Sequence, residues 1–289
     1  MSFRTVVIKK QCKCSYKNGY LVVRDDETTL VHLSEVYCLV FDTTAISVTA
    51  YLLNELCKRK IPLIICDEQH NPSGEILPIY GCHNTSKRIA IQTAWKENSK
   101  EAVWTAIVRE KISQQSKHLK KLNMNEFMLL EEYIDQLEFF DKSNREGHAA
   151  KVYFHALFGK DFSRDDDSYI NAALNYGYGI ILSTFNREIV SNGYLTQIGI
   201  RHKNEFNEFN LSCDLMEPFR IVVDRFVTKN HPFVFDEEIR FGLVDLLNEK
   251  VLFDEGQYYL SSAIGLYVKS VFAAIQTCEC ERIKFYDFL

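Results

Sequence analysis

Hydrophobic positions in the first 80 or so residues fall into short runs that alternate with turn-forming residues. Each run is rich in β-branched and aromatic side chains, which is typical of β-strands. Asn18 and Gly19 readily adopt positive φ angles, so they predict a tight hairpin between two antiparallel strands. The predicted strands cover residues 5–8, 12–16, 20–23, 28–32, 36–41 and 62–66.

The hydrophobic pattern takes helical spacing over residues 47–59, where leucines recur on one face, and Ser47 is placed to cap this helix. Helical spacing then dominates from about residue 84 onward, after a break that contains Pro78 and Gly81. Later predicted helices cover residues 145–157, 168–190, 214–227, 236–247 and 261–277.

These patterns predict an α+β fold in two domains. A small N-terminal β-rich domain is expected over residues 1–76, followed by a linker at 77–84. A larger all-α domain is expected over residues 85–289.

Composition supports a folded, cytoplasmic protein without a membrane partner. Hydrophobic residues make up 46% of the chain and charged residues 25%, which are ordinary values for a globular protein. The start of the chain lacks the features of a signal peptide, and no apolar run approaches the roughly 20 residues that span a bilayer. Several of the nine cysteines stand in apolar segments, which favours a reducing compartment.

The net charge of −5 does not suggest a nucleic-acid partner, but the charge is unevenly distributed. Residues 84–123 hold nine Lys or Arg against three acids, whereas residues 124–140 hold five acids and no Lys or Arg. This basic segment fits a surface that follows a phosphate backbone. A solvated helix face balanced by its acidic neighbour explains it equally well.

Glu146 is the first residue whose position needs an explanation. On a helix it shares a face with Ala149, Ala150 and Tyr153, which suit a protein interior. A carboxylate at such a face needs a counter-charge or hydrogen-bond donors. A position at the water boundary in the first helical turn, a salt bridge and a metal ion each satisfy this need.

A second polar group comes from residues 199–220. Asp214 and Glu217 are three residues apart, and Pro218 favours a helix start there, with Asp214 near the cap. In the structural alternative, Asp214 is only a cap and His202 is a surface loop residue. Together with Glu146, however, these side chains make an oxygen and nitrogen donor set of the kind that binds Mg²⁺ or Mn²⁺. Five cations flank them and suit a phosphodiester substrate: Arg145, Lys151, Arg201, Lys203 and Arg220.

Four segments resemble successive motifs of the CRISPR-associated integrase family Cas1. They are Arg-Glu-Gly-His-Ala-Ala at 145–150, Asn-Tyr-Gly-Tyr at 175–178, Gly-Ile-Arg-His at 199–202 and Asp-Leu-Met-Glu-Pro-Phe-Arg at 214–220. The N-terminal half is similar to the type II subgroup, through Arg4-Thr5-Val6-Val7 and Ser15-Tyr16-Lys17-Asn18. Lys151 and Ile221 depart from the family pattern, where Arg and Pro are common.

The resemblance implies that the helical domain is catalytic, with Glu146, His202 and Glu217 as ligands of Mg²⁺ or Mn²⁺ and Asp214 in a supporting role. It implies a homodimer that assembles with the small partner Cas2 and acts with other proteins of type II CRISPR systems. The implied reaction joins a short DNA duplex to a CRISPR repeat by attack of a 3′ hydroxyl on a phosphodiester. Expected DNA contacts are Lys87, Arg88, Arg145, Lys151, Arg201, Lys203 and Arg220.

Two other functions stay open at this point. One is a repair nuclease that cuts branched DNA through the same residues. The other is a DNA-binding scaffold whose carboxylates are structural. The Cys12/Cys14 and Cys278/Cys280 pairs lack the spacing of a zinc site, and there is no glycine-rich phosphate loop.

Overall fold

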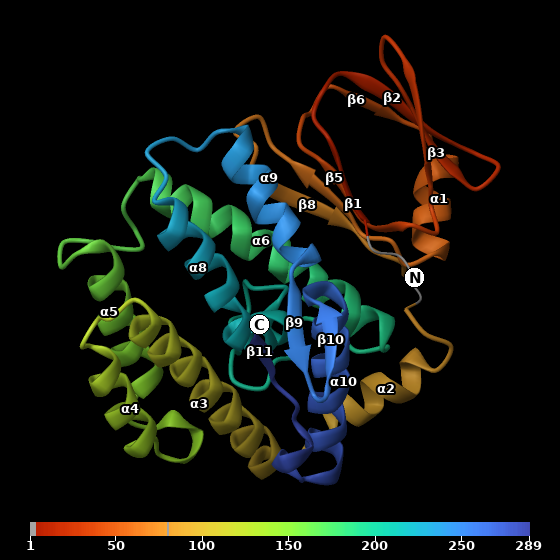
Figure 1. Ribbon diagram of the computed structural model, residues 1–289. Coiled ribbons are helices and arrows are strands. Elements are labelled where there is room, and N and C mark those ends of the chain that lie inside the picture. The colour runs from red at the N-terminus through yellow and green to blue at the C-terminus, as the bar shows by residue number, and fades with distance from the viewer. Residues whose placement is uncertain (1–3, 80) are drawn as a thin grey trace.

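The computed structural model describes residues 4–79 and 81–289, with most strands in the N-terminal part and most helices in the rest (Figure 1). The predicted β-rich start is confirmed, although two short strands were not predicted. The N-terminal elements are β1 (Arg4–Ile8), β2 (Cys12–Lys17), β3 (Tyr20–Arg24), β4 (Thr28–His32), β5 (Val36–Phe41), β6 (Ile46–Val48), α1 (Ala50–Lys58), β7 (Leu63–Cys66) and β8 (Pro72–Ile76).

The N-terminal strands form two sheets. One sheet has the order β4-β3-β2-β6, and the other has the order β1-β5-β7-β8. The hairpin predicted at Asn18 and Gly19 joins β2 to β3, with φ angles of 49° and 89° at these two residues. The parallel pairs β1/β5, β5/β7 and β2/β6 come from strands that are distant in sequence.

The start of α1 differs from the prediction. Thr49 caps the helix, since its hydroxyl accepts a hydrogen bond from the backbone N–H of Leu52 at 3.3 Å. Ser47, the predicted cap, lies in β6 and pairs with β2. Backbone pairing with a distant strand therefore outweighs the local helical pattern at this residue.

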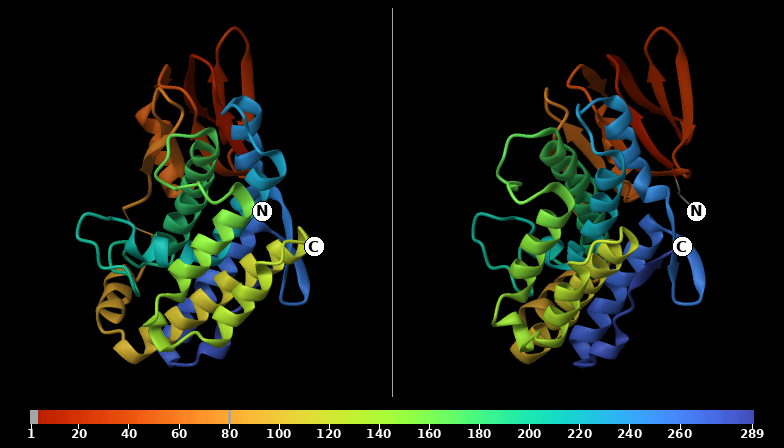
Figure 2. Two further views of the ribbon diagram at one scale, coloured as in Figure 1. Left: turned by 90° about the vertical axis from the view of Figure 1, so that its left-hand side faces the viewer. Right: turned by 60° about the vertical axis from the view of Figure 1, so that its left-hand side comes forward.

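The sheet that contains β5 is the layer shared by the two parts of the chain. All six residues of β5 are buried. Leu39 and Leu63 pack in the N-terminal core, whereas Val40 and Ile64, which point to the opposite face, pack in the core of the helical part. Helices α6 (Tyr169–Ser191) and α9 (Glu237–Asp245) lie beside this sheet (Figures 1 and 2). The helical part therefore packs against one face of this sheet.

The change from strands to helices falls within residues 77–84, where the linker was predicted.

None of the helices among residues 4–79 and 81–289 is long and apolar enough to cross a membrane. The remaining helices are α2 (Thr85–Thr93), α3 (Glu97–Lys121), α4 (Phe127–Asp135), α5 (Arg145–Phe158), α7 (Asn210–Met216), α8 (Arg220–Asn230) and α10 (Leu260–Thr277), with short 3-10 turns η1 (Phe139–Asp141), η2 (Glu217–Phe219), η3 (Leu246–Asn248) and η4 (Cys280–Arg282).

The prediction that the larger part is all-α is wrong, because it contains a small antiparallel sheet. The strands β9 (Lys250–Phe253), β10 (Gly256–Tyr259) and β11 (Tyr286–Phe288) lie in the order β10-β9-β11. Alternate residues of β9 are buried, so it follows the period of a strand. Each strand is too short for its pattern to stand out in the sequence.

The helix predicted over 214–227 is broken into α7, η2 and α8. Asp214 lies inside α7 rather than at a cap, so the predicted cap position is wrong. The break coincides with Pro218, which has no N–H to donate to the preceding turn. This break places Glu217 at the junction of two helices.

Candidate active site

Glu146 lies in the first turn of α5, which is held in place by a buried carboxylate from the preceding turn. Asp141 accepts hydrogen bonds from the backbone N–H groups of Arg145 at 2.6 Å and Glu146 at 3.1 Å. These N–H groups have no partner within the helix, so Asp141 satisfies them from outside. The backbone of Glu146 is thus fixed even though its side chain is 21% exposed.

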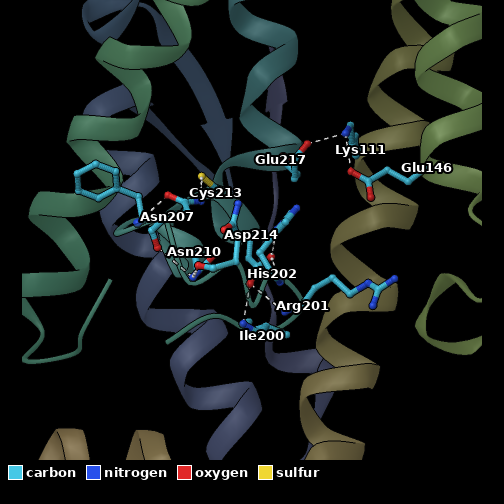
Figure 3. Close-up of polar contacts among 12 residues, drawn as sticks. Lys111, Glu146, Ile200, Arg201, His202, Asn207, Asn210, Cys213, Asp214 and Glu217 are labelled. Carbon is cyan, nitrogen blue, oxygen red and sulfur yellow. Dashed lines mark hydrogen bonds and ion pairs between the residues drawn. The ribbon is translucent and has the colours of Figure 1, made fainter. Parts of the chain in front are cut away.

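Lys111 of α3 connects Glu146 to Glu217 (Figure 3). Its Nζ lies 2.6 Å from Oε1 of Glu146 and 2.5 Å from Oε2 of Glu217. Burial would lower the pKa of Lys111, but the two carboxylates raise it above its ordinary value. The ammonium group is therefore charged, and the two carboxylates share its single positive charge.

Glu217 is held from a second side by Arg220, whose Nε donates to Oε1 at 2.9 Å. Burial alone would raise the pKa of Glu217, but Arg220 and Lys111 outweigh burial and lower it to about 2. Glu217 is consequently ionised across the physiological pH range, as a metal ligand must be.

Asp214 organises the loop that carries His202. Its carboxylate is fully buried and accepts hydrogen bonds from the N–H groups of Ile200 at 2.6 Å and Arg201 at 2.9 Å. It also accepts from the N–H of His202 at 3.2 Å, and it lies 2.5 Å from that residue's Nδ1. The hydrogen bond from the imidazole raises the pKa of His202. With Nδ1 engaged, Nε2 is the nitrogen left to bind a metal.

The predicted ligand residues gather in one region, but there is no one group that all three contact. Glu146 and Glu217 meet at the ammonium of Lys111, and the charges of both act on His202. Within residues 4–79 and 81–289, no three His, Cys, Asp or Glu side chains stand at metal-binding spacing. The donor types nevertheless fit Mg²⁺ or Mn²⁺, because two carboxylates already converge on one cation beside an oriented imidazole.

A cavity of about 230 Å³ adjoins these residues and was not predicted from the sequence. Lys111, Glu217 and Arg220 line it together with buried Asp224 and with Tyr178, whose hydroxyl donates to Asp224. The sequence did carry a signal for Lys111. That residue is spaced with Trp104, Ile107 and Val108 on the buried face of α3, where an unpaired lysine is costly.

Of the seven predicted DNA contacts, Arg220 lies at the carboxylates, and the other six differ in exposure and in their partners. Lys87 and Lys151 are exposed, whereas Arg88 donates a hydrogen bond to the hydroxyl of Tyr194 at 3.3 Å. The remaining three have partners within the chain. Arg145 lies over the ring of Tyr133, Arg201 lies over Phe140, and Lys203 pairs with Glu97.

The family model and the similar proteins that match this chain all belong to one family. Residues 5–231 match the family model described as "CRISPR associated protein Cas1". A CRISPR-associated endonuclease Cas1 from Neisseria meningitidis is 29% identical over all of this chain and 97% of its own length. A Cas1 endonuclease from Saccharolobus solfataricus is 26% identical over 85% of this chain and 81% of its own length.

Solved structures share the fold at low sequence identity. A Cas6-RT-Cas1–Cas2 complex matches with a TM-score of 0.77 at 19% identity, over 99% of this chain and 36% of that chain. A casposase bound to its integration product matches with a TM-score of 0.76 at 17% identity, over 96% of this chain and 91% of that chain. A Cas1 protein from Thermotoga maritima matches with a TM-score of 0.71 at 14% identity, over 95% of this chain and 97% of that chain.

Proposed function

Because the chain belongs to the Cas1 family of CRISPR-associated proteins, we propose that it is a metal-dependent DNA integrase and endonuclease of CRISPR adaptation. Its substrates are a short DNA duplex and a CRISPR repeat, and it works in the cytoplasm as a homodimer with Cas2. The type II subgroup is proposed from the N-terminal motifs. The names of the similar proteins, which include endonucleases, a complex with Cas2 and a casposase, support this assignment.

One observation carries the chemical part of the proposal. Glu146 and Glu217, which are distant in sequence, converge on a single cation beside an imidazole that Asp214 orients. We propose Glu146, His202 and Glu217 as the ligands of Mg²⁺ or Mn²⁺, with Asp214 as the group that positions His202. A bound divalent cation supplies alignment of the reacting oxygens and neutralises charge on the phosphoryl group.

The chain's own residues account for the rest of the reaction. A 3′ hydroxyl of the incoming duplex attacks a phosphodiester, so that one P–O bond forms as another breaks and a 3′ hydroxyl leaves. Arg220 presents positive charge beside the carboxylates, which otherwise repel the phosphate. Since one phosphodiester replaces another, the same site also reverses the reaction on branched DNA.

The test is a joining assay with a labelled duplex that ends in a 3′ hydroxyl, a plasmid with CRISPR repeats, and Mg²⁺ or Mn²⁺, with and without Cas2. We expect covalent joint products, and release of the branch from a branched substrate. Glu146→Ala and His202→Ala should abolish both reactions, and Glu217→Gln should do the same. Glu131→Ala, on an exposed position of α4, is the matched control and should retain both.

The same assay separates the other two functions. Cleavage without joint products indicates a nuclease that cuts branched DNA. DNA binding without any metal-dependent strand chemistry indicates a scaffold. Joining that persists in Glu146→Ala or His202→Ala would contradict the proposed ligands.

A further inference from the structure

The ion pair of Lys111 with both glutamates poses a physical problem for a metal site. One ammonium lies 2.6 Å from Glu146 and 2.5 Å from Glu217, and only 12% of the lysine side chain is exposed. An ammonium group has no lone pair, so it cannot act as a metal ligand while it is protonated. Two positive charges that share the same carboxylates also repel each other strongly where water is scarce.

We propose that Lys111 is an internal competitor of the divalent cation: its ammonium holds Glu146 and Glu217 together in the metal-free protein and leaves them when the metal binds. This inference rests on the proposed function, because it takes both glutamates as metal ligands. Without Lys111, only Arg220 would offset the charge of the two carboxylates, so they would repel each other more strongly before the metal arrives. Lys111 therefore stabilises the metal-free site and lowers its affinity for metal.

The structure also offers a destination for the displaced side chain. Lys111 lines the cavity of about 230 Å³ that contains the buried carboxyl group of Asp224, and its charge already acts on that group. The lysine side chain is long and flexible, so it can exchange one acidic partner for another without movement of α3. The cost of breaking the first ion pair is then partly offset by the second.

The experiment measures Mn²⁺ binding by the loss of the free-ion signal in electron paramagnetic resonance. Lys111→Met removes the charge but keeps most of the side-chain volume. We expect it to lower the Mn²⁺ dissociation constant by roughly tenfold, which corresponds to about 1.4 kcal/mol. Lys111→Arg keeps the charge and should bind Mn²⁺ no more tightly than the wild-type protein. An unchanged or weaker Mn²⁺ affinity in Lys111→Met would overturn the inference.

Lys117→Met is the matched control, because it removes the same charge from the same helix. Its side chain is 53% exposed and pairs with Asp287 at 3.3 Å, away from the glutamates. We expect its Mn²⁺ affinity to equal that of the wild-type protein. An equal gain in both Met variants would mean that net charge alone sets the affinity, and would also overturn the inference.

Thermal unfolding gives a second readout, which stays informative if a Lys111 variant does not fold without metal. Metal-free Lys111→Met and Lys111→Gln should melt below the wild-type protein, and Mn²⁺ should raise their melting temperatures more than it raises that of the wild type. Variants that fold only in Mn²⁺ would support the inference, and variants that fail to fold even in Mn²⁺ would contradict it.

Glu146→Gln distinguishes this inference from the proposed function. If Mn²⁺ binding to the wild-type protein does not depend on Glu146, the proposed ligands are wrong and the role of Lys111 falls with them. If binding depends on Glu146 but the Lys111 variants bind no more tightly, the proposed function stands and only the competition is refuted.

Discussion

At the scale of single residues, Asp224 has an acid–base property that its surroundings impose. Its side chain is 1% exposed and lies beside Tyr178 in the cavity next to Glu217. Burial raises the pKa of Asp224 from 3.8 to about 6, although the hydrogen bond from Tyr178 and the nearby cations act in the opposite direction. The folded protein therefore holds this proton more tightly than the unfolded chain does.

A raised carboxyl pKa predicts that this group's contribution to stability falls as the pH rises from about 4 to about 6. In this range the native state binds more protons than the unfolded state, so a higher pH favours unfolding. Asp224→Asn removes the ionisation and should stabilise the protein at pH 7 by up to about 3 kcal/mol, with little gain at pH 4. Urea unfolding of both proteins across this range measures the difference.

Asp161→Asn serves as the control for this pH prediction, because Asp161 is exposed. Its effect on the free energy of unfolding should be small at both pH values. A gain from Asp224→Asn that is the same at pH 4 and pH 7 would show that the side chain acts through packing or hydrogen bonding rather than through its charge.

At the scale of elements, the segment between α6 and α7 holds His202 through its backbone. A Cβ on Gly199 would lie 2.5 Å from the carbonyl oxygen of His202, so only glycine allows this close approach. Asp214 on α7 then accepts hydrogen bonds from three successive backbone N–H groups of the same segment. Helix α7 thereby sets the orientation of a residue that lies outside it.

Asp214→Asn is therefore predicted to weaken metal binding without unfolding the protein. The amide would place a donor where the carboxylate accepts from backbone N–H groups, and it would loosen the hold on the imidazole. We expect Mn²⁺ affinity and joining activity to fall by roughly 10- to 100-fold. Asp135→Asn, on an exposed position of α4, should change neither. Wild-type Mn²⁺ affinity in Asp214→Asn would refute the positioning role.

The elements also show which parts of the fold were accessible from sequence. Most N-terminal strands and the hairpin at Asn18 follow from local residue preferences, so their positions were predicted within one or two residues. Strand β8 was missed because Pro72–Ile76 has the composition of a loop, and its pairing with β7 is not local. The break at Glu217 was missed because Pro218 was interpreted as a helix start.

The sequence likewise indicated some residues of the candidate site and not others. Motif resemblance pointed to Glu146 and His202, and their role as metal ligands stays a prediction. Lys111 was counted only as part of the basic segment, since its two acidic partners come from other helices. Sequence spacing specifies which face of α3 Lys111 occupies, but it does not specify which carboxylates meet that face.

At the scale of the whole molecule, an acidic protein must concentrate positive charge locally to bind DNA. The net charge is −5, yet several exposed cations stand close in sequence to the proposed ligands. Lys151 follows Glu146 on α5, and Lys203 follows His202, with 66% of its side chain exposed. These two lysines come from different segments, and each lies close in sequence to a proposed ligand, so they are the residues with which to test a phosphate contact.

DNA binding should therefore weaken steeply with salt, and these lysines should set part of that dependence. A protein that neutralises phosphates releases counterions, so the logarithm of its affinity falls linearly with the logarithm of salt concentration. Replacing Lys151 and Lys203 together by Ala should reduce the slope by about 2, or about 1 for each lost contact. Fluorescence anisotropy with a labelled duplex at several NaCl concentrations measures the slope. Lys269→Ala, on an exposed position of α10, should leave it unchanged, and an unchanged slope in the double variant would place the phosphate path elsewhere.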